Sequence, residues 1–398
     1  MNILVINCGS SSIKYQLYSV QADGTMQVLA KGIVEKIGVD GSYLKYETGS
    51  VKLQKDAPIS SYRDGFKLIL QVLLDQSHGI LNDLNEITAV GHRAVHGGEF
   101  TRSAIVTDEV IHKIEEYASL APLHNPVNLI GIREAMRVLP AIPHIAVFDT
   151  AFHQTMLPEA YFYALPYEFF EKNRIRRYGF HGTSLKYVTQ RAIELLLSPI
   201  EKMKMVICHL GSGITVAAVS GGKSVDASTG FTPLAGPLMG TRCGDLDPGL
   251  VLYLQRELRL SLEQVDQLLN REGGLLGISG VSSDMRVIID KAKEGDMRCQ
   301  LALEMFVYQV KKYIGAYAAA MGGLDALVFT AGVGENSPLI RSMICEGLEF
   351  LGIELEKGRN EETFAREGFI SQDLSPVKVM VVPTNEELMI ALDTLAFL

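Results

Sequence analysis

The sequence contains few cysteines and no paired cysteine motif. Its 398 residues include five, which are Cys8, Cys208, Cys243, Cys299 and Cys345. Their number is odd, they are scattered along the chain, and none of them belongs to a CxxC spacing. Neither a disulfide framework nor a cysteine zinc site is therefore predicted. We expect the protein to work in a reducing compartment, the cytoplasm.

The sequence also lacks a long apolar run that is free of charges. The longest apolar segment with helical character, residues 301–321, contains Glu304, Lys311 and Lys312, which a bilayer would accommodate only at a high cost in free energy. We predict a core helix here and no membrane partner. The chain also does not open with a charged region followed by an apolar one, so we expect no cleaved or exported leader.

Positive charge is also scarce, because 37 Lys and Arg face 46 Asp and Glu, which gives a net charge of −9. This balance argues against broad binding to nucleic acid or to acidic membranes, although it permits a locally basic cleft. The composition, 47% hydrophobic and 21% charged, is that of a globular protein, and 398 residues exceed one ordinary core. Since no low-complexity linker separates the halves, we expect two domains packed closely around a shared cleft.

Glycine and serine, in contrast, are concentrated in two related segments. Residues 5–14, VINCGSSSIK, recur in altered form as residues 206–215, VICHLGSGIT. In each copy, two apolar runs joined by small residues predict a strand, a tight turn and a strand. Such a turn lets backbone amides approach a phosphate, and Lys14 adds a positive charge. Neither copy has the spacing of a P-loop or a dinucleotide fingerprint. One copy alone is typical of an ordinary hairpin, but two copies predict one nucleotide cleft.

The predicted elements follow a similar order in the two halves. In the first half we expect strands at 3–6, 13–18, 87–90 and 145–148 and a helix at 61–74. In the second half we expect a hairpin at 206–219, a Gly- and Pro-rich loop at 228–249 and long helices. A strand at 327–329 and a loop to 336 follow. A strand at 378–382 precedes a helix at 386–398, which we expect to pack back on the first domain. We therefore predict an α/β fold with domains at 1–149 and 150–385, and functional side chains at the strand ends.

Two arginines lie in glycine-rich segments that suit anion binding. Arg93 belongs to GHRAVHGG after the strand at 87–90, and Arg242 belongs to MGTRCGDLDPG. A guanidinium group is a planar fork that matches a carboxylate or a phosphate. Two such arginines facing each other could hold a carboxylate and a phosphate together. The alternative is that each one pairs with a local acid.

Three further side chains are candidates for the chemistry. Asp149 ends an apolar strand and could present a carboxylate to Mg²⁺ or to an attacking oxygen, although the residues alone favour a cap of the following helix. His124 and His181 lie in stiff or glycine-bounded loops and could donate to a phosphoryl oxygen. For a lone histidine, a structural hydrogen bond is the more ordinary role.

Segments in the C-terminal third of the chain complete the set of candidate site residues. Residues 284–286, DMR, and 330–337, TAGVGENS, are typical of nucleoside contacts, and the second motif has Ser337 and Pro338 as the cap and first residue of a helix. Glu386 and Glu387 could close a Mg²⁺ shell. Solvated acids at a helix start are the alternative.

Together these segments resemble the acetate kinase family, of the superfamily that includes sugar kinases, heat-shock proteins and actin. The resemblance extends from Asn2 to Thr394. The matching segments, in the family's order, are NCGSSSIKY, GHRAVHGGE, APLHNP, FDTAFHQTM, RRYGFHGTS, GFTPLAG, MGTRCGDLDPG, FTAGVGENS and PTNEEL.

The resemblance implies reversible, in-line transfer of the ATP γ-phosphoryl group to acetate, with Mg²⁺ (or Mn²⁺). It also implies a homodimer in which each chain has two duplicated ribonuclease-H-like, actin-like ATPase domains with a cleft between them, the first the acyl-kinase domain and the second the nucleotide-binding domain. The implied catalytic residues are Asp149, His181 and Arg242, the acid-binding residues Arg93, Val95 and His124, and the metal-binding residues Asn7 and Glu386. The implied nucleotide-binding residues are Lys14, His209, Leu210, Gly211, Ser212, Gly213, Asp284, Met285, Arg286, Gly332, Val333, Gly334, Glu335 and Asn336.

The sequence departs from the family pattern at a few positions. Ser212 replaces an Asn in HLGNG, and Leu185, Thr229 and Ala235 replace the family's His, Met and Glu. These changes bear on ATP affinity and turnover more than on identity. Val95 stands where related propionate kinases often have Ala, which favours acetate by about 1–3 kcal/mol. The alternatives are a propionate or short-chain acyl kinase, an actin-like or chaperone-like ATPase without an acid acceptor, and a weakened homologue that only binds nucleotide.

Overall fold

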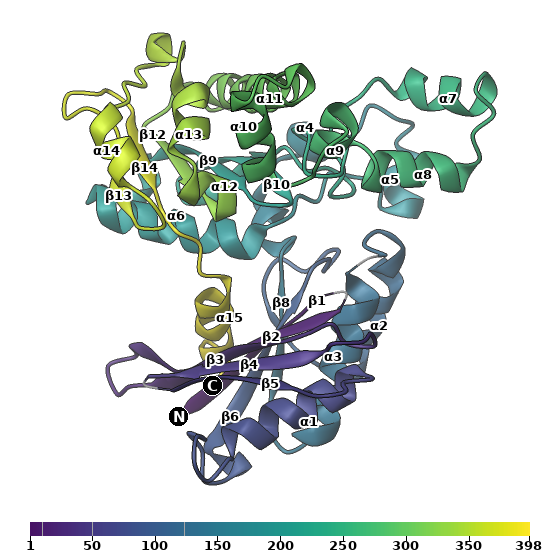
Figure 1. The fold of residues 1–398 in the computed structure, drawn as a ribbon, viewed down its shortest axis with the longest axis vertical. Coiled ribbons are helices and arrows are strands. Elements are labelled where there is room, and N and C mark those ends of the chain that lie inside the picture. Colours follow the sequence, from purple (N-terminus) through teal and green to yellow (C-terminus); the bar gives the residue numbers. More distant parts are fainter. Residues whose placement is uncertain (10, 50, 123) are drawn as a thin grey trace. The chain divides into compact units, whose positions relative to one another are not determined.

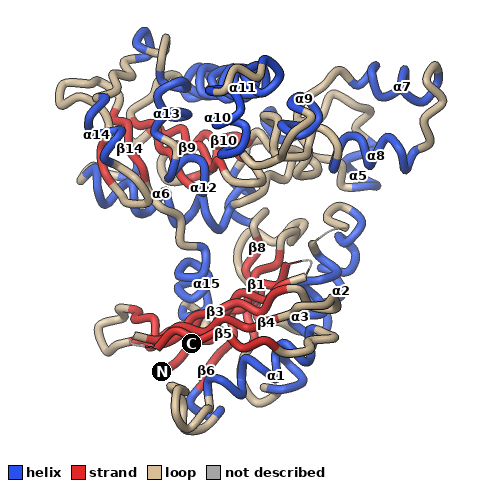
Figure 2. Tube along the Cα trace, viewed as in Figure 1, coloured by secondary structure: helices blue, strands red, loops and turns tan. Residues whose placement is uncertain are grey.

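The computed structural model describes residues 1–9, 11–49, 51–122 and 124–398, and it divides the chain into two compact units (Figure 1). Unit 1 consists of Met1–Gln154, Gly182–Ser184 and Asn385–Leu398. Unit 2 consists of Thr155–His181 and Leu185–Thr384. A central β-sheet with helices around it forms each unit (Figure 2).

Unit 1 contains an eight-stranded sheet in the order β5-β4-β3-β2-β1-β6-β8-β7. Its strands are β1 Asn2–Gly9, β2 Ser12–Val20, β3 Met26–Glu35, β4 Tyr43–Thr48, β5 Val51–Asp56, β6 Ile87–Ala94, β7 Ala104–Ile105 and β8 His144–Phe148. Its helices are α1 Tyr62–Leu73, α2 Asp108–Glu116, α3 Asn125–Val138 and α15 Glu386–Leu395.

Helices cover both faces of the sheet around β1. Leu4 and Ile6 point into a core with residues of α1 and α3, whereas Ile3 and Val5 point into a core with Ile390 of α15. A strand covered on both faces has an almost continuous apolar sequence, which is why β1 reads NILVINCG. The C-terminal helix α15 therefore packs on β1, β6 and β8, on the face opposite α1 and α3 (Figure 1).

Unit 2 contains a six-stranded sheet in the order β11-β10-β9-β12-β14-β13. Its strands are β9 Lys204–Leu210, β10 Ile214–Ser220, β11 Lys223–Ala227, β12 Ala326–Thr330, β13 Gly368–Phe369 and β14 Lys378–Val381. Its helices are α4 Pro158–Tyr161, α5 Glu168–Asn173, α6 Gly182–Leu196, whose first turn belongs to unit 1, α7 Pro248–Arg256, α8 Leu262–Arg271, α9 Gly274–Ser279, α10 Met285–Lys293, α11 Met297–Met321, α12 Ala331–Asn336, α13 Pro338–Cys345 and α14 Lys357–Glu362.

The predicted core helix lies within α11. Phe306, Val310 and Ile314 of this helix are buried against residues of β9 and β10. Charged side chains on its other faces interrupt the apolar surface, and of the helices that the structure describes, none has the length and apolarity needed to cross a membrane.

The two units share one strand arrangement, which confirms the predicted duplication. In unit 1 the order β3-β2-β1-β6-β8 places β1 antiparallel to β2 and parallel to β6, and in unit 2 the order β11-β10-β9-β12-β14 gives β9 the same neighbours. The two glycine-rich segments are the β1–β2 and β9–β10 hairpins, as the repeat predicts.

Two local predictions need correction. Arg93 lies within β6, because the strand continues beside β8 with Arg93 opposite Val147. Residues 331–336 form helix α12 and not a loop. The buried Arg341 guanidinium donates to the carbonyl oxygens of Gly334 (2.9 Å) and Glu335 (3.0 Å), so the end of this short helix is satisfied without a longer helical run.

Candidate active site

In unit 1 an arginine and an aspartate meet at the carboxyl ends of two neighbouring parallel strands. Arg93 is on β6 and Asp149 directly follows β8. The Nε atom of Arg93 lies 3.3 and 3.2 Å from the two carboxylate oxygens of Asp149, and one terminal nitrogen lies 2.6 Å from Oδ2. Asp149 is only 1% exposed. The carboxylate that the residues alone favoured as a helix cap is thus held in a forked ion pair.

Two more side chains surround this pair. Thr183, in the first turn of α6, donates its hydroxyl to Oδ1 of Asp149 at 2.7 Å. Glu386, at the start of α15, places a carboxylate oxygen 3.5 Å from another nitrogen of Arg93. Burial raises the pKa of Glu386, Arg93 opposes that shift and Asp149 adds to it. For Arg93 itself, burial alone would lower the pKa, but Asp149 and Glu386 outweigh burial and raise it. The guanidinium therefore remains charged between two carboxylates.

The loop after β6 is fixed by two asparagines of α3 that sequence reasoning missed. Asn128 accepts the backbone N–H of Val95 at 3.0 Å and donates to the carbonyl of Cys8 at 3.0 Å. Asn125 accepts the backbone N–H of His96 at 2.9 Å. Val95 is buried. The only sequence signal for this role is the three-residue spacing of the asparagines, which places both on one face of the helix.

The remaining candidates of unit 1 lie on the first hairpin and before α3. Asn7 of β1 is buried and pairs in register with Lys14 of β2, whose side chain is exposed. His124 is the residue that precedes α3. The APLHNP segment also contains residue 123, which lies outside the described residues.

In unit 2 two histidine rings stack beside the second hairpin. The rings of His181 and His209 have centroids 4.4 Å apart and are inclined by 11°. Nδ1 of His181 lies 2.8 Å from the hydroxyl oxygen of Thr215. His181 has φ 58°, a left-handed conformation that costs a non-glycine residue free energy and is concentrated at functional sites. A Cβ atom at Gly213 would lie 3.0 Å from the His181 ring and 3.6 Å from Arg242, so glycine leaves room for both.

Arg242 is the second arginine of the predicted pair of anion-binding groups. It lies near the carbonyl of Pro233 (3.5 Å) and the sulfur of Met239 (3.7 Å). It forms no ion pair with any carboxylate in the described part of the chain. Burial lowers its pKa. A partly buried guanidinium without a carboxylate partner is an available site for an anion.

A cavity of about 990 Å³ opens beside the second hairpin in unit 2. The predicted nucleotide residues that line it are Gly211, Ser212, Asp284, Met285, Arg286, Gly332, Val333 and Asn336. Sequence reasoning missed Ile289, Phe306 and Phe364, whose apolar side chains line the same cavity. Asp284 caps α10 and accepts from Arg286 at 2.6 Å, an interaction that lowers the pKa of Asp284.

The other predicted nucleotide residues lie outside the lining of this cavity. Leu210 and Gly334 are buried, His209 is stacked on His181, and Gly213 adjoins that ring. Glu335 accepts the backbone N–H of Thr384 at 3.0 Å. These five residues therefore do not line the cavity directly.

The donor set of unit 1 fits magnesium by chemical type. Among the residues that the structure describes, no group of three or more His, Cys, Asp and Glu is arranged to hold a metal ion. However, Mg²⁺ usually binds one or two carboxylates and fills its other positions with phosphate oxygens and water. Asp149 and Glu386 share Arg93, and Asn7 adds an amide oxygen on the adjacent strand β1. Oxygen donors of this kind and number suit magnesium.

Comparison with known proteins gives one family over nearly the whole chain. A model described as the acetokinase family matches residues 2–392. The acetate kinase of Thermotoga maritima is 54% identical over 397 residues, which cover 99% of this chain and 98% of the relative. The acetate kinase of Alkaliphilus metalliredigens is 52% identical over 396 residues, with 99% of both chains covered.

Solved structures give the same result. The acetate kinase of Porphyromonas gingivalis superposes with a TM-score of 0.92 at 48% identity, and 99% of each chain is covered. A propionate kinase from Francisella tularensis superposes with a TM-score of 0.91 at 41% identity over the same shares.

Proposed function

This chain belongs to the acetokinase family, and from that premise we propose that it catalyses the reversible transfer of the γ-phosphoryl group of ATP to acetate, which yields acetyl phosphate and ADP. It is a kinase with a carboxyl group as acceptor. Its two units have the architecture of duplicated actin-like ATPase domains. The observation that carries the proposal is Arg242, an arginine without a carboxylate partner among the described residues, beside His181 and the glycine hairpin of unit 2.

We propose that ATP binds in the cavity of unit 2. Its volume of about 990 Å³ lies within the range of small-molecule sites. Backbone amides of the turn at Gly211 and Ser212 would contact phosphate oxygens, and the apolar side chains of Met285 and Phe364 would contact the base or ribose. Ser212 lines the cavity where the family pattern has Asn, so we expect this chain to bind ATP more weakly than a relative with Asn at this position.

We propose that acetate binds in unit 1. Arg93 would bind its carboxylate, with Val95 at the methyl group. Because acetate is already ionised at neutral pH, it needs no general base to act as a nucleophile. Asp149, held by Arg93 and Thr183, would therefore orient the acceptor and the metal and not remove a proton. When bound at Asn7 and Glu386, Mg²⁺ would neutralise part of the phosphate charge.

Catalysis would rest on positioning and on donors to the transferring phosphoryl group. Phosphoryl transfer involves little covalent chemistry by the protein, and its transition state spreads negative charge over three equatorial oxygens. His181 and Arg242 would donate to these oxygens, and Lys14 would lie beside the nucleotide phosphates. Thr215 fixes the His181 ring through Nδ1, which prepares the ring before the reaction.

Three further features support a homodimer, a location in the cytoplasm and a second acid as substrate. Exposed apolar side chains on the α7–α8 segment, such as Leu252 (49%), Leu258 (55%) and Leu262 (69%), support burial against a second copy in a homodimer. The five cysteines are free thiols, which supports the cytoplasm. The propionate kinase neighbour supports a related acid as a slower substrate.

The first experiment measures acetyl phosphate formation, trapped as the hydroxamate, from Mg·ATP with acetate, propionate, butyrate or no acid. The proposal predicts product only with an acid and the highest kcat/KM with acetate. A preference for propionate would assign the chain to the propionate kinases. Hydrolysis of ATP without acid, or no reaction, would instead favour an ATPase or a binding protein.

A further inference from the structure

One half of the unit 1 sheet has a face that no described helix covers. Helix α1 packs on β3 and β4 from one side, and α15 covers β1, β6 and β8 on the other side. The α15 side of β3, β4 and β5 is left open. A pocket of about 560 Å³ lies there, between this open face and Glu387 of α15.

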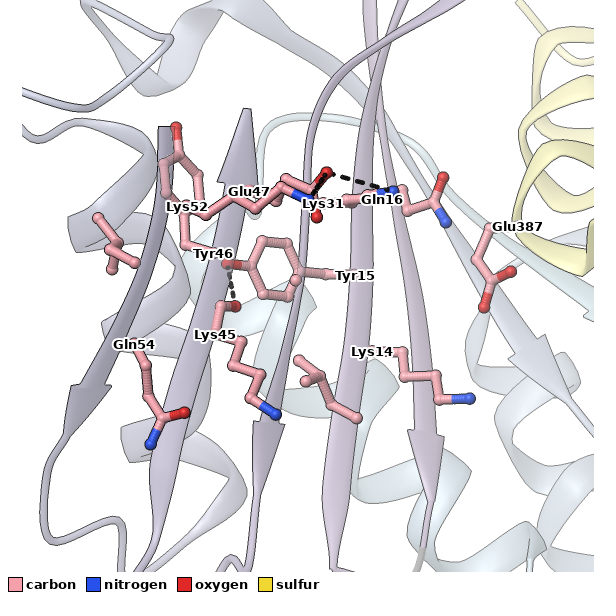
Figure 3. A pocket seen from close by; sticks show the side chains of 13 residues that line it. Lys14, Tyr15, Gln16, Lys31, Lys45, Tyr46, Glu47, Lys52, Gln54 and Glu387 are labelled. Carbon is pink, nitrogen blue, oxygen red and sulfur yellow. Dashed lines mark hydrogen bonds and ion pairs between the residues drawn. The ribbon is translucent and has the colours of Figure 1, made fainter. Parts of the chain in front are cut away.

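The side chains of this face form rows across the strands, because the registers align them, and two of these rows line the pocket. The first row contains Lys14, Ile33, Lys45 and Gln54, and the second contains Gln16, Lys31, Glu47 and Lys52. Figure 3 shows Lys31 and Lys52 turned toward Glu47 in the second row and the Lys14 and Lys45 side chains away from that group. Four lysines and two glutamates thus line the pocket of an otherwise acidic protein.

The two rows differ in how their charges are compensated. In the second row Glu47 lies 3.7 Å from Lys31 and 3.2 Å from Lys52. In the first row neither Lys14 nor Lys45 forms an ion pair with a described residue, and Lys45 has only the Tyr43 ring at 5.1 Å. The first row therefore carries two lysines without a direct ion pair on either side of an apolar side chain, Ile33, and Lys14 also acts on the charge of Glu386.

The spacing of this row defines the ligand that it fits. Adjacent strands lie about 4.8 Å apart, so the backbones of Lys14 and Lys45, two strands apart, are separated by roughly 10 Å. We propose that this row is a binding site for a small organic ligand with two anionic ends, each a carboxylate or a phosphate, and an apolar middle that rests on Ile33; such a ligand is called a dianion below, whatever the charge of each end. This row adjoins the cluster around Arg93, because Lys14 acts on the charge of Glu386. Lys14 is the one residue of the row that also belongs to the proposed nucleotide-binding residues.

Protection of the sheet edge does not account for the whole pattern. Lysines on an edge strand prevent pairing with another chain, and Lys52 on β5 has this position. Lys14 and Lys45 are on the inner strands β2 and β4, where the backbone is already paired on both sides. Edge protection therefore does not explain these two lysines, and an anionic ligand between them would.

The test is calorimetric titration of the full chain at low salt with three probes that each contain a chain of six carbon atoms. The probes are adipate, 1,6-hexanediol bisphosphate and hexanoate. Adipate and the bisphosphate distinguish carboxylate from phosphate chemistry, and hexanoate lacks the second charge. We expect hexanoate to bind at least about tenfold more weakly than the better dianion, because it leaves one lysine unpaired.

Three variants locate the site. Lys45→Gln removes one charge, and Gln54→Glu gives Lys45 a carboxylate neighbour in the same row. Each should weaken the better dianion about fivefold. Lys67→Gln makes the same charge change on α1, which packs on the opposite face, and should have no effect. Acetyl phosphate formation, measured without a dianion, should be unchanged in all three, so the proposed function is tested apart from this site.

Two results would overturn the proposal. One is the absence of binding by either dianion. The other is equal binding to the wild type and to Lys45→Gln, since the anion would then be held elsewhere, for example at Arg93.

Discussion

Substitution of Thr183 by valine tests how much the Asp149 carboxylate depends on a single hydroxyl. Asp149 is 1% exposed, and its carboxylate is held by Arg93 and by the Thr183 hydroxyl at 2.7 Å. Valine has the same shape and branching as threonine, so Thr183→Val removes the donor without opening a cavity. Oδ1 of Asp149 then loses its hydroxyl donor in a place that water does not readily reach.

The expected loss follows from the charge of the acceptor. A hydrogen bond to a charged group contributes about 1.5–3 kcal/mol, more than one between neutral groups. We therefore expect the free energy of unfolding to fall by about 1.5–3 kcal/mol in urea titrations. Because the carboxylate also loses its orientation in the transition state, we expect kcat to fall by about tenfold to a hundredfold while the KM for ATP stays the same.

Thr183→Ser is the matched control, because serine keeps the hydroxyl and loses only a methyl group. We expect it to recover most of kcat in the hydroxamate assay. The reasoning is refuted if valine leaves kcat within about twofold of the wild type, or if serine is as impaired as valine.

Three further outcomes are expected. Arg242→Ala should remove about 3 kcal/mol or more of transition-state stabilisation, measured as kcat in the hydroxamate assay, and near-normal turnover with unchanged substrate affinity would sink its assignment. Val95→Ala should raise the propionate-to-acetate ratio of kcat/KM by about tenfold, and an unchanged ratio would place the methyl pocket elsewhere. Burial lowers the pKa of His92 and His144, and that of His96 to about 3. All three are neutral in the folded protein. Their contribution to the free energy of unfolding is therefore complete above about pH 6.5, the pKa of histidine in the unfolded chain, and it decreases as the pH falls toward the pKa values of the folded protein. Urea unfolding at pH 7.5 and 5.5 should show a loss of up to about 4 kcal/mol, and equal stability at both values would contradict this account.

The sequence predicts those parts of the fold that depend on local pattern. The two hairpins were recognisable because small residues interrupt two similar apolar runs, and strand β1 because its apolar run is nearly continuous. Ser337 and Pro338 also begin α13 as their residue types predict. Each of these features is determined within about ten residues of chain, where side-chain periodicity and turn chemistry are decisive.

The site contains contacts that no local pattern specifies. Thr183 reaches Asp149 across 34 positions in the chain, and Asn128 reaches Cys8 across 120. Helix α12 likewise depends on Arg341, which donates to carbonyl groups at its end. Such residues become visible only when the fold brings distant segments together, because threonine and asparagine have many ordinary roles on a helix.

The charge balance around Arg93 connects these observations to the proposed chemistry. One guanidinium lies against the carboxylates of Asp149 and Glu386, so the cluster carries no surplus positive charge of its own. The raised pKa of Glu386, caused first by burial, shows that the second carboxylate is already costly there. An acetate ion at Arg93 would add a further negative charge in a poorly solvated place. A divalent cation among these oxygen ligands would offset that charge, and this supports magnesium even though no three-ligand cluster is arranged among the described residues.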